Sequence, residues 1–383
     1  MQDELIIGGA GILPVDYTYL IPKEQSREKA ENSILKLLFP VSEPPSVAFR
    51  YDSYQKSGGG QVANILAHLS ALGHTTSIAG TVGSDDAGQF VLEDLKAHGV
   101  NVTCINKQYS KYTRLVFILY KIGTKDSKQI HLPKGEFIGG NKVRSNWLSL
   151  NYLPHGTIFI TNRANKKILK YISEISKHGC LTSFHLGVKP WRNVEQSLFR
   201  EAISTSWLVV ASQKSAAWLG LKGTNEDRIL LKSLGGPQLI VVFENPGSFW
   251  AVSKDFGVIK PDSLNNSKVI EPTGMLDAFH AGFLSYILRK GLLGSATEDE
   301  LHSGLLFANQ IAVACGKRVG ARYSLLRSDL ENLRKDPKNF IHPGRVTEIK
   351  IIINELNIDE LKVIHQYGLG DNISGDKVLG DKK

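Results

Sequence analysis

The chain of 383 residues alternates between short apolar runs of strand length and longer stretches with helical spacing. The strand-like runs occupy residues 5–9, 77–83, 114–120, 157–161, 181–186, 207–211, 238–243 and 249–253. Helical spacing appears between several of them, at residues 86–98, 164–178 and 194–204. Strands that alternate with helices are typical of folds in which each helix returns the chain to a parallel sheet. The pattern therefore predicts an α/β fold with a mostly parallel central sheet flanked by helices.

Three consecutive glycines, residues 58–60, precede one of the apolar helical patterns. Glycine adopts backbone angles that other residues resist, and it leaves no side chain between the main chain and a ligand. The residues that follow with helical spacing are Val62, Ile65, Leu66, Leu69 and Leu72. We therefore expect a loop that opens a helix, with Asn64 in the first turn, where its amide can bind a hydroxyl group. A flexible hinge with a local capping bond is the alternative.

A second glycine-containing turn places a carboxylate at the start of another helix. Pro272 and Gly274 keep the chain irregular, and a mostly apolar helical pattern follows Asp277. The amides of Gly274, Met275 and Leu276 are expected to lie free at this helix N-terminus, where an anion can bind. An acid beside an anion pocket suits phosphoryl transfer, because it can accept a hydroxyl proton. The alternative is an acid that only complements the helix dipole.

The N-terminal segment contains glycines that could be mistaken for a dinucleotide-binding loop. Pro14 stands where that motif requires its third glycine, and no helical pattern follows directly. A nicotinamide or flavin site is therefore excluded. Asp16 follows in the same segment, and it is either a turn residue or an acceptor for ligand hydroxyls.

Over roughly residues 4–325 the chain resembles the ribokinase/PfkB carbohydrate kinase family. The first motif of the resemblance consists of Gly58, Gly59, Asn64, Ala67, Leu72, Gly73, Gly80, Gly83, Asp86 and Gly88. The second consists of Thr273, Gly274, Asp277, Ala278, Phe279, Ala281 and Gly282. Gly8, Asp16, Asn309, Gly320 and Ala321 also fall where the family has similar residues.

The resemblance implies a ribokinase-like three-layer sandwich with a small β lid. The lid elements are expected within about residues 16–57 and 111–137, inside a kinase domain of residues 1–325. Residues 326–383 are expected to form a C-terminal extension with a mobile tail. The implied activity is ATP-dependent phosphorylation of a hydroxyl group on a sugar, nucleoside or related small molecule. ATP and Mg²⁺ are the implied cofactors, and lid sheets of this family often pair between subunits, so a homodimer is expected.

The resemblance also assigns roles to individual residues. Asp277 is the implied catalytic base, with Gly274, Met275 and Leu276 supplying backbone amides for the phosphate. The implied substrate-binding residues are Asp16, Gly59, Gly60 and Asn64, and the implied cofactor-binding residues are Gly247 and Asn309. No metal-ligating residue is assigned.

The nucleotide side departs from the family pattern more than the sugar side does. Met275 and Leu276 replace small residues, and Leu276 is expected to crowd a phosphate. In the turn that ends at Gly247, Glu244 replaces a glycine, and its carboxylate is expected to repel phosphates. Residues 212–215 lack the carboxylate that the family links to magnesium, and residues 184–187 replace an Asp-Pro-Asn stretch. Two interpretations stay open: an active kinase, and an impaired member retained for ligand binding or regulation.

Other chemistry has weaker support in the sequence. His131, His155 and His185 lie in no metal-binding spacing, so we interpret each as structural. Arg114 lies on a strand-like stretch, where it either meets a substrate or phosphate or is an exposed strand cation. The cysteines, Cys104, Cys180 and Cys315, are odd in number and far apart, which favours buried thiols in a reducing compartment.

The net charge of +9 admits a third class, a nucleic-acid-binding protein. Lys and Arg are dispersed along the chain and form no patch interleaved with aromatic residues, which argues against that class. The sequence contains no secretory leader pattern and no apolar stretch of about 18 residues, the length that a membrane helix needs. We therefore expect no membrane association and a cytoplasmic location.

Overall fold

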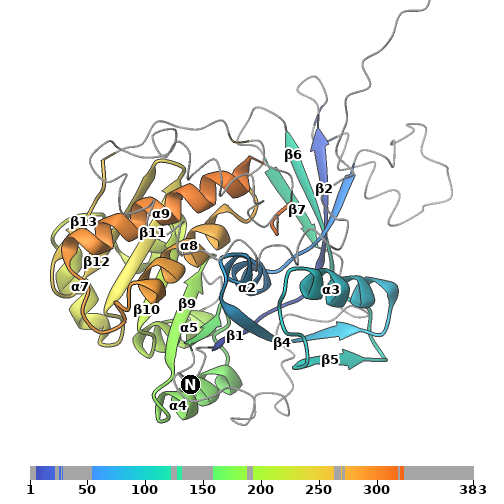
Figure 1. Ribbon diagram of the computed structural model, residues 1–383, viewed down its shortest axis with the longest axis horizontal. Coiled ribbons are helices and arrows are strands. Elements are labelled where there is room, and N and C mark those ends of the chain that lie inside the picture. The colour runs from blue at the N-terminus through green and yellow to red at the C-terminus, as the bar shows by residue number, and fades with distance from the viewer. Residues whose placement is uncertain are drawn as a thin grey trace, which may run out of the picture.

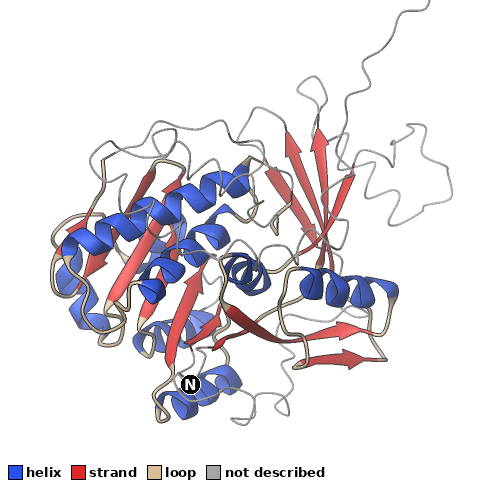
Figure 2. Ribbon diagram, viewed as in Figure 1, coloured by secondary structure: helices blue, strands red, loops and turns tan. Residues whose placement is uncertain are grey.

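The structure is a computed structural model that describes residues 6–21, 26, 28, 54–121, 127–131, 158–187, 193–262, 269, 272–317 and 320–322. Within these residues the chain forms a large sheet covered by helices and a second, smaller sheet at its side (Figure 1, Figure 2). A sheet flanked by helices is the arrangement predicted from the alternating sequence pattern. The C-terminal extension at 326–383 lies outside the described residues, so the division of the chain at residue 325 stays a prediction.

The large sheet has nine described strands in the order β13-β12-β11-β10-β9-β8-β1-β4-β5. They are β1 (Ile6–Ala10), β4 (Thr75–Gly83), β5 (Ile105–Gln108), β8 (Ile158–Thr161), β9 (Leu181–Leu186), β10 (Leu208–Ser212), β11 (Leu239–Asn245), β12 (Ser248–Ser253) and β13 (Gly257–Ile259). Neighbours from β5 to β11 pair in parallel, and β12 and β13 add an antiparallel edge. The strand-like runs of the sequence coincide with these strands to within two residues at each end, apart from 114–120, which belongs to the second sheet.

Helices cover both faces of this sheet because alternate strand residues point to opposite sides. One face carries α2 (Gln61–Ala71), α3 (Asp86–Ala97), α8 (Met275–Arg289) and α9 (Glu298–Gly316), and the other carries α4 (Lys166–Ser176), α5 (Asn193–Ser204), α6 (Gln213–Leu219) and α7 (Asp227–Leu234). Val210 and Val241 join the core with α2, α8 and α9, whereas Val209 and Ile240 join the core with α5, α6 and α7. The three-layer arrangement is therefore confirmed.

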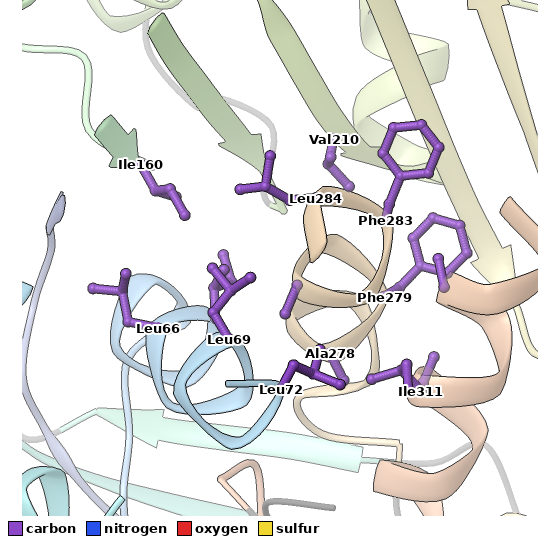
Figure 3. Close-up of a cluster of buried hydrophobic side chains, with 14 of the residues drawn as sticks. Leu66, Leu69, Leu72, Ile160, Val210, Ala278, Phe279, Phe283, Leu284 and Ile311 are labelled. Carbon is purple, nitrogen blue, oxygen red and sulfur yellow. The ribbon is translucent and has the colours of Figure 1, made fainter. Parts of the chain in front are cut away.

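The first of these cores fixes the position of α8 (Figure 3). Phe279, Phe283 and Leu284 on α8 are buried between the sheet and the neighbouring helices, beside Leu69 of α2 and Ile311 of α9. A helix that is apolar on nearly all sides is stable only when it is covered on all sides. The N-terminus of α8 is thus held rigidly near the carboxyl ends of β1, β8 and β9, where open α/β sheets bind ligands.

The smaller sheet consists of β2 (Val15–Ile21), β3 (Tyr54–Gly58), β6 (Leu115–Lys121) and β7 (Ser127–His131), in the order β3-β2-β6-β7. It extends from the edge of the large sheet near α3 (Figure 1). This is the lid-like sheet expected from the two segments at 16–57 and 111–137, although parts of both segments lie outside the described residues. Dimerisation through this sheet stays a prediction. Among the described helices, none has the length and apolarity required to cross a bilayer.

Candidate active site

Asp277 lies in the first turn of α8 and is 5% exposed. Gly274, the N-cap residue of α8, has a φ of 81°. Among the described residues, only glycines have a positive φ. The expectation that the amide of Met275 is free is wrong, because this amide donates to the carbonyl of Pro272 at 3.2 Å. Within the described part of the chain, the amides of Gly274, Leu276 and Asp277 have no backbone acceptor. These are the groups that remain for an anion.

The two bulky residues of this turn point in different directions. Met275 is 1% exposed, and its sulfur would lie 2.6 Å from a Cβ added at Gly316 of α9. Leu276 is only partly buried against the core. The Met275 side chain is therefore packed against α9, and Leu276 remains the residue expected to crowd a phosphate.

Asn64 joins the glycine-rich loop to the carboxylate of Asp277. Its Nδ2 donates to Asp277 Oδ2 at 2.8 Å, and its Oδ1 accepts from Arg322 Nε at 3.1 Å. Because a guanidinium is only a donor, it fixes which end of the amide faces it. Asn64 is 3% exposed, so both polar ends of the side chain are used inside the protein. The sequence placed Asn64 correctly in the first turn of its helix but did not reveal these two partners.

Arg322, which sequence reasoning missed, connects three segments of the site. The residue is 2% exposed. Its guanidinium donates to Asn64, to the carbonyl of Gly59 and to Asp94 Oδ2 of α3, the last at 2.5 Å. The only sequence signal was its position directly after Ala321, at the end of the resemblance. A lone arginine in such a position is usually solvated.

Asp16 and the glycines at 59 and 60 are brought together as predicted. A Cβ added at Gly59 would lie 2.2 to 2.3 Å from the carboxylate atoms of Asp16, so the carboxylate packs directly on the glycine backbone. Gly60 has φ 100° and caps α2, and a Cβ there would lie 2.1 Å from the carbonyl oxygen of Ile12. At Gly60 only glycine fits, because the φ is positive and a side chain would collide with the backbone of Ile12, whereas a side chain at Gly59 would displace the Asp16 carboxylate. Asp16 itself is 7% exposed.

His185, near the end of β9, also reaches the carboxylate. Its Nε2 lies 3.1 Å from Asp277 Oδ1, an ion-pair distance at which the ring nitrogen is not aligned for a hydrogen bond. Its Nδ1 lies 3.1 Å from Nδ1 of His280, and His280 Nε2 lies 2.7 Å from Ser183 Oγ. The two rings stack with centroids 5.4 Å apart. The interpretation of His185 as purely structural missed this contact, since spacing along the chain cannot show which helix faces the strand.

Burial determines which groups donate and which accept in the series Ser183, His280 and His185. Burial lowers the pKa of His280 well below its usual value, and the neighbouring His185 lowers it further. A neutral His280 can accept the Ser183 hydroxyl at Nε2 and donate from Nδ1 to His185. If His185 accepts at Nδ1, its N–H is at Nε2, which lies 3.1 Å from Asp277 Oδ1 but outside hydrogen-bond geometry. Ser183, His280 and His185 are all buried, so this series of hydrogen-bonding groups is shielded from solvent.

The residues assigned to the nucleotide side contact one another. The amide of Gly247 donates to Asn309 Oδ1 at 3.1 Å, and Asn309 is 3% exposed. Glu244 accepts hydrogen bonds from Ser248 Oγ at 2.6 Å and from Trp250 Nε1 at 3.1 Å. Its carboxylate is therefore held within the β11–β12 hairpin, which reduces the repulsion that the sequence led us to expect. Within the described residues, no three His, Cys, Asp or Glu side chains converge as metal ligands.

His68 of α2 gives the folded state a pH dependence. It is fully buried, with Nε2 3.2 Å from the carbonyl oxygen of Ala321, and burial lowers its pKa from 6.5 to about 4, although the charge of Asp277 acts in the opposite direction. The unfolded chain therefore takes up a proton at a pH where the folded chain does not. Acidification from pH 7 to pH 5 is expected to lower the free energy of unfolding by about 2 kcal/mol through this group.

Urea denaturation of the native chain and of His68→Gln at both pH values measures this effect. Glutamine keeps a donor for the carbonyl but does not titrate, so the variant should lose less stability on acidification. Other buried histidines contribute equally to both proteins and cancel in the comparison. Equal losses in the two proteins would show that His68 is not the titrating group.

Comparisons with known proteins identify the family and the fold. The family model described as pfkB family carbohydrate kinase matches residues 34–327. A protein of Pyrococcus horikoshii described as a sugar kinase is 26% identical over 301 residues, covering 76% of this chain and 90% of the relative. A fructokinase from Xylella fastidiosa with bound ATP has a TM-score of 0.66 at 17% identity, and the match covers 86% of this chain and 98% of that one. A ribokinase II from E. coli in complex with ATP and Mg²⁺ has a TM-score of 0.63 at 15% identity, covering 92% and 99%. These likenesses confirm the ribokinase-like fold.

Proposed function

This chain belongs to the pfkB family of carbohydrate kinases, and from that premise we propose that it transfers the γ-phosphoryl group of ATP to a hydroxyl group of a small carbohydrate or nucleoside. The observation that carries the proposal is the enclosed carboxylate of Asp277, at the N-terminus of α8 and between two fixed neighbours. Asp277 is the general base in this scheme. The fold alone would not support the assignment, because one fold can host many activities.

The carboxylate has the free capacity that a base needs. Each of its oxygens offers two lone-pair directions, and Asn64 and His185 each face one oxygen. Each oxygen can therefore accept one more hydrogen bond, from an acceptor hydroxyl. A base that is hydrogen-bonded to Asn64 and bordered by His185 loses little freedom when the substrate binds, which favours reaction from the bound geometry.

The residues of the α8 turn fit the charge that develops during transfer. The amides of Gly274, Leu276 and Asp277 lie at the positive end of the helix dipole without a described backbone acceptor. When bound, ATP supplies the phosphoryl group and Mg²⁺ offsets the charge of its phosphates. Mg²⁺ in such sites takes few protein ligands and keeps several waters, so a preformed cluster of acids is not required. Gly247 and Asn309 are the residues that we assign to the nucleotide side.

Asp16, Gly59 and Gly60 are assigned to the acceptor. The carboxylate of Asp16 packs on the glycine backbone and offers acceptors for hydroxyl groups. Asn64 belongs to the same side, and its bond to Asp277 supports a role in holding the base. The test is acceptor-dependent formation of ADP across a panel of sugars and nucleosides, because a kinase of this kind consumes ATP only when a suitable acceptor is present.

The second candidate function is a ligand-binding member without turnover. The altered turn at Glu244 and the bulky Leu276 are the features that favour it. In that case a sugar or nucleoside binds with measurable affinity in calorimetry, and no acceptor stimulates ADP formation. The same panel therefore separates the two functions.

His185 is proposed to position the base. Replacing it with Phe keeps a ring but removes the donor toward Asp277, so kcat is expected to fall on the order of 10-fold with KM nearly unchanged. His185→Gln, which keeps a donor at a similar reach, should retain more activity. Steady-state kinetics of both variants measure the difference.

Ser183→Ala is the matched control for His185. It removes the far end of the same hydrogen-bonded chain without touching Asp277. We expect it to lower stability by about 1 to 3 kcal/mol, because a buried partner is left unpaired, while kcat changes little. If His185→Phe loses only stability, as Ser183→Ala does, the positioning role is refuted.

A further inference from the structure

Two arginines have no role in the proposed mechanism: Arg114, which interacts with Asp16, and Arg163, which interacts with Arg114. We propose that Arg114 and Arg163 bind an oxyanion on the acceptor, so that the preferred acceptor is a sugar acid or a sugar phosphate. The inference rests on the proposed function, because it names the substrate class of the same site.

Arg114 is placed next to Asp16 by the lid-like sheet. Its carbonyl accepts the amide of Val15 at 2.9 Å, and β2 and β6 then pair in register with Asp16 opposite Val116. The guanidinium is half-buried and feels the charge of Asp16. Of the two alternatives that the sequence left for Arg114, this location supports the ligand contact and not the exposed strand cation.

Arg163 approaches the same place from the large sheet. It follows the end of β8, and its amide donates to Thr161 Oγ1 at 3.1 Å. Its Nε is buried and has no hydrogen-bond partner among the described residues. An arginine offers five N–H donors and is almost never buried without a partner. Such an unsatisfied donor is the kind of group that a ligand completes.

The two guanidinium groups act on each other. Burial, with a smaller contribution from the charge of Arg114, lowers the pKa of Arg163 to about 10, so Arg163 still carries its charge at neutral pH. Two cations that share a partly buried region repel each other, and Asp16 is the acid that acts on Arg114. An oxyanion placed between them would reverse this repulsion. Arginine binds carboxylate and phosphate with two parallel hydrogen bonds, which matches this need.

A series of contacts connects the arginines to the proposed base. Asn162, next to Arg163, donates from Nδ2 to Gln61 Oε1 at 2.6 Å. A Cβ added at Gly187 would lie 2.1 Å from Gln61 Nε2 and 2.8 Å from His185 Nε2. His185 in turn faces Asp277. These contacts link the segment that carries Arg163 to the proposed base, and in our proposal the oxyanion lies at one end of the acceptor and the reacting hydroxyl at the other.

Asn162 adds an acceptor within this site. Its Oδ1 is buried and has no partner among the described residues, while its Nδ2 is already used by Gln61. A buried carbonyl oxygen without a donor can accept a ligand hydroxyl. The unsatisfied atoms of Arg163 and Asn162 thus comprise one donor for an anion and one acceptor for a hydroxyl, which is the pattern of a hydroxylated acid.

Calorimetry and ADP-formation kinetics with matched pairs of probes test the proposal. D-gluconate is compared with D-glucose, and D-fructose 6-phosphate with D-fructose, within panels of sugar acids, sugar phosphates and neutral sugars. For at least one acidic probe, Kd or KM is expected to be at least about 10-fold lower than for its neutral partner, since a hydrogen bond to a charged group contributes about 1.5 to 3 kcal/mol. The carboxylate and phosphate arms distinguish the two sources of the oxyanion.

Arg163→Gln and Arg114→Gln should each raise Kd or KM for that acidic probe by about 10- to 100-fold and leave the neutral partner nearly unchanged. Arg163→Lys should recover only part of the loss, because an ammonium group cannot bind two oxygens in parallel. Arg200→Gln, at an exposed arginine of α5 whose guanidinium lies over Trp218, is the matched control. Thermal unfolding of each variant verifies that it is folded.

The outcomes separate this inference from the proposed function. If neutral acceptors are phosphorylated in an Asp277-dependent reaction and no acidic probe is preferred, the inference is overturned. The proposed kinase function is then still supported. Acidic probes that bind in an Arg163-dependent way without any ADP formation would support the anion site and contradict the kinase. If no acidic probe binds better than its neutral partner in either assay, the anion site is wrong.

Discussion

Asp277→Asn is expected to lower kcat by about 10²- to 10⁴-fold, the range of a general base in proton transfer. Asparagine has nearly the same size as aspartate but cannot take the hydroxyl proton. The expectation is strengthened because, among the described residues, no other acid contacts both Asn64 and His185 and could take the proton in place of Asp277. The measurement is acceptor-dependent ADP formation under saturating acceptor, once an acceptor has been found with the panel.

The matched control for this variant is Glu298→Gln. Glu298 is an exposed acid in the first turn of α9, so it tests what the loss of an acid at a helix N-terminus does by itself. The helix-dipole interpretation of Asp277 predicts only a change in stability, of about 0.3 to 1 kcal/mol, for both variants. A fall in kcat for Asp277→Asn alone supports the base. Unchanged turnover in Asp277→Asn, with a small loss of stability as in Glu298→Gln, would refute the mechanism.

Arg322→Met is expected to destabilise the fold by about 3 to 5 kcal/mol, as when one partner of a buried ion pair is removed. Methionine fills much of the volume but leaves Asp94, the Asn64 amide oxygen and the Gly59 carbonyl without their donor. The side chains of the Arg322 and Asp94 pair are 1% and 12% exposed, so water replaces these bonds poorly. Urea denaturation at neutral pH measures the free energy of unfolding.

Two comparisons sharpen the result for Arg322. Arg200→Met removes an exposed arginine and its ring contact with Trp218, and it should cost no more than about 1 kcal/mol. Arg322→Lys keeps the charge but cannot reach three acceptors at once, so it should fall between the native chain and Arg322→Met. Equal losses for Arg322→Met and Arg200→Met would show that the buried network does not hold the three segments together.

The sequence predicted the elements of this fold well because their signals are local. Strands such as β9 and β10 follow from short apolar runs, and α2 and α8 follow from apolar spacing after glycine-containing turns. The glycine at 274 was expected to permit an irregular turn, and its φ of 81° agrees. The amide of Met275 was assigned wrongly, because a hydrogen bond to Pro272 depends on how the turn closes.

The partners of the site residues could not be predicted from spacing. Asn64 and Asp277 are 213 positions apart in sequence, and Arg322 and Asn64 are 258 apart. Glu244 was expected to face phosphates, yet Ser248 and Trp250 hold its carboxylate in a hairpin. Each of these contacts depends on which elements pack together.

The amino-acid sequence by itself determined the alternating layers, the glycine turns and the acid at the start of α8, since each depends on neighbouring residues and on backbone sterics. Only the tertiary structure decided that Asn64, His185 and Arg322 surround or support that acid, and that Arg114 interacts with both Asp16 and Arg163. The physical reason is that hydrogen bonds and charge interactions act over a few ångströms in space, and chain separation carries no information about that distance until the sheet and helices have packed.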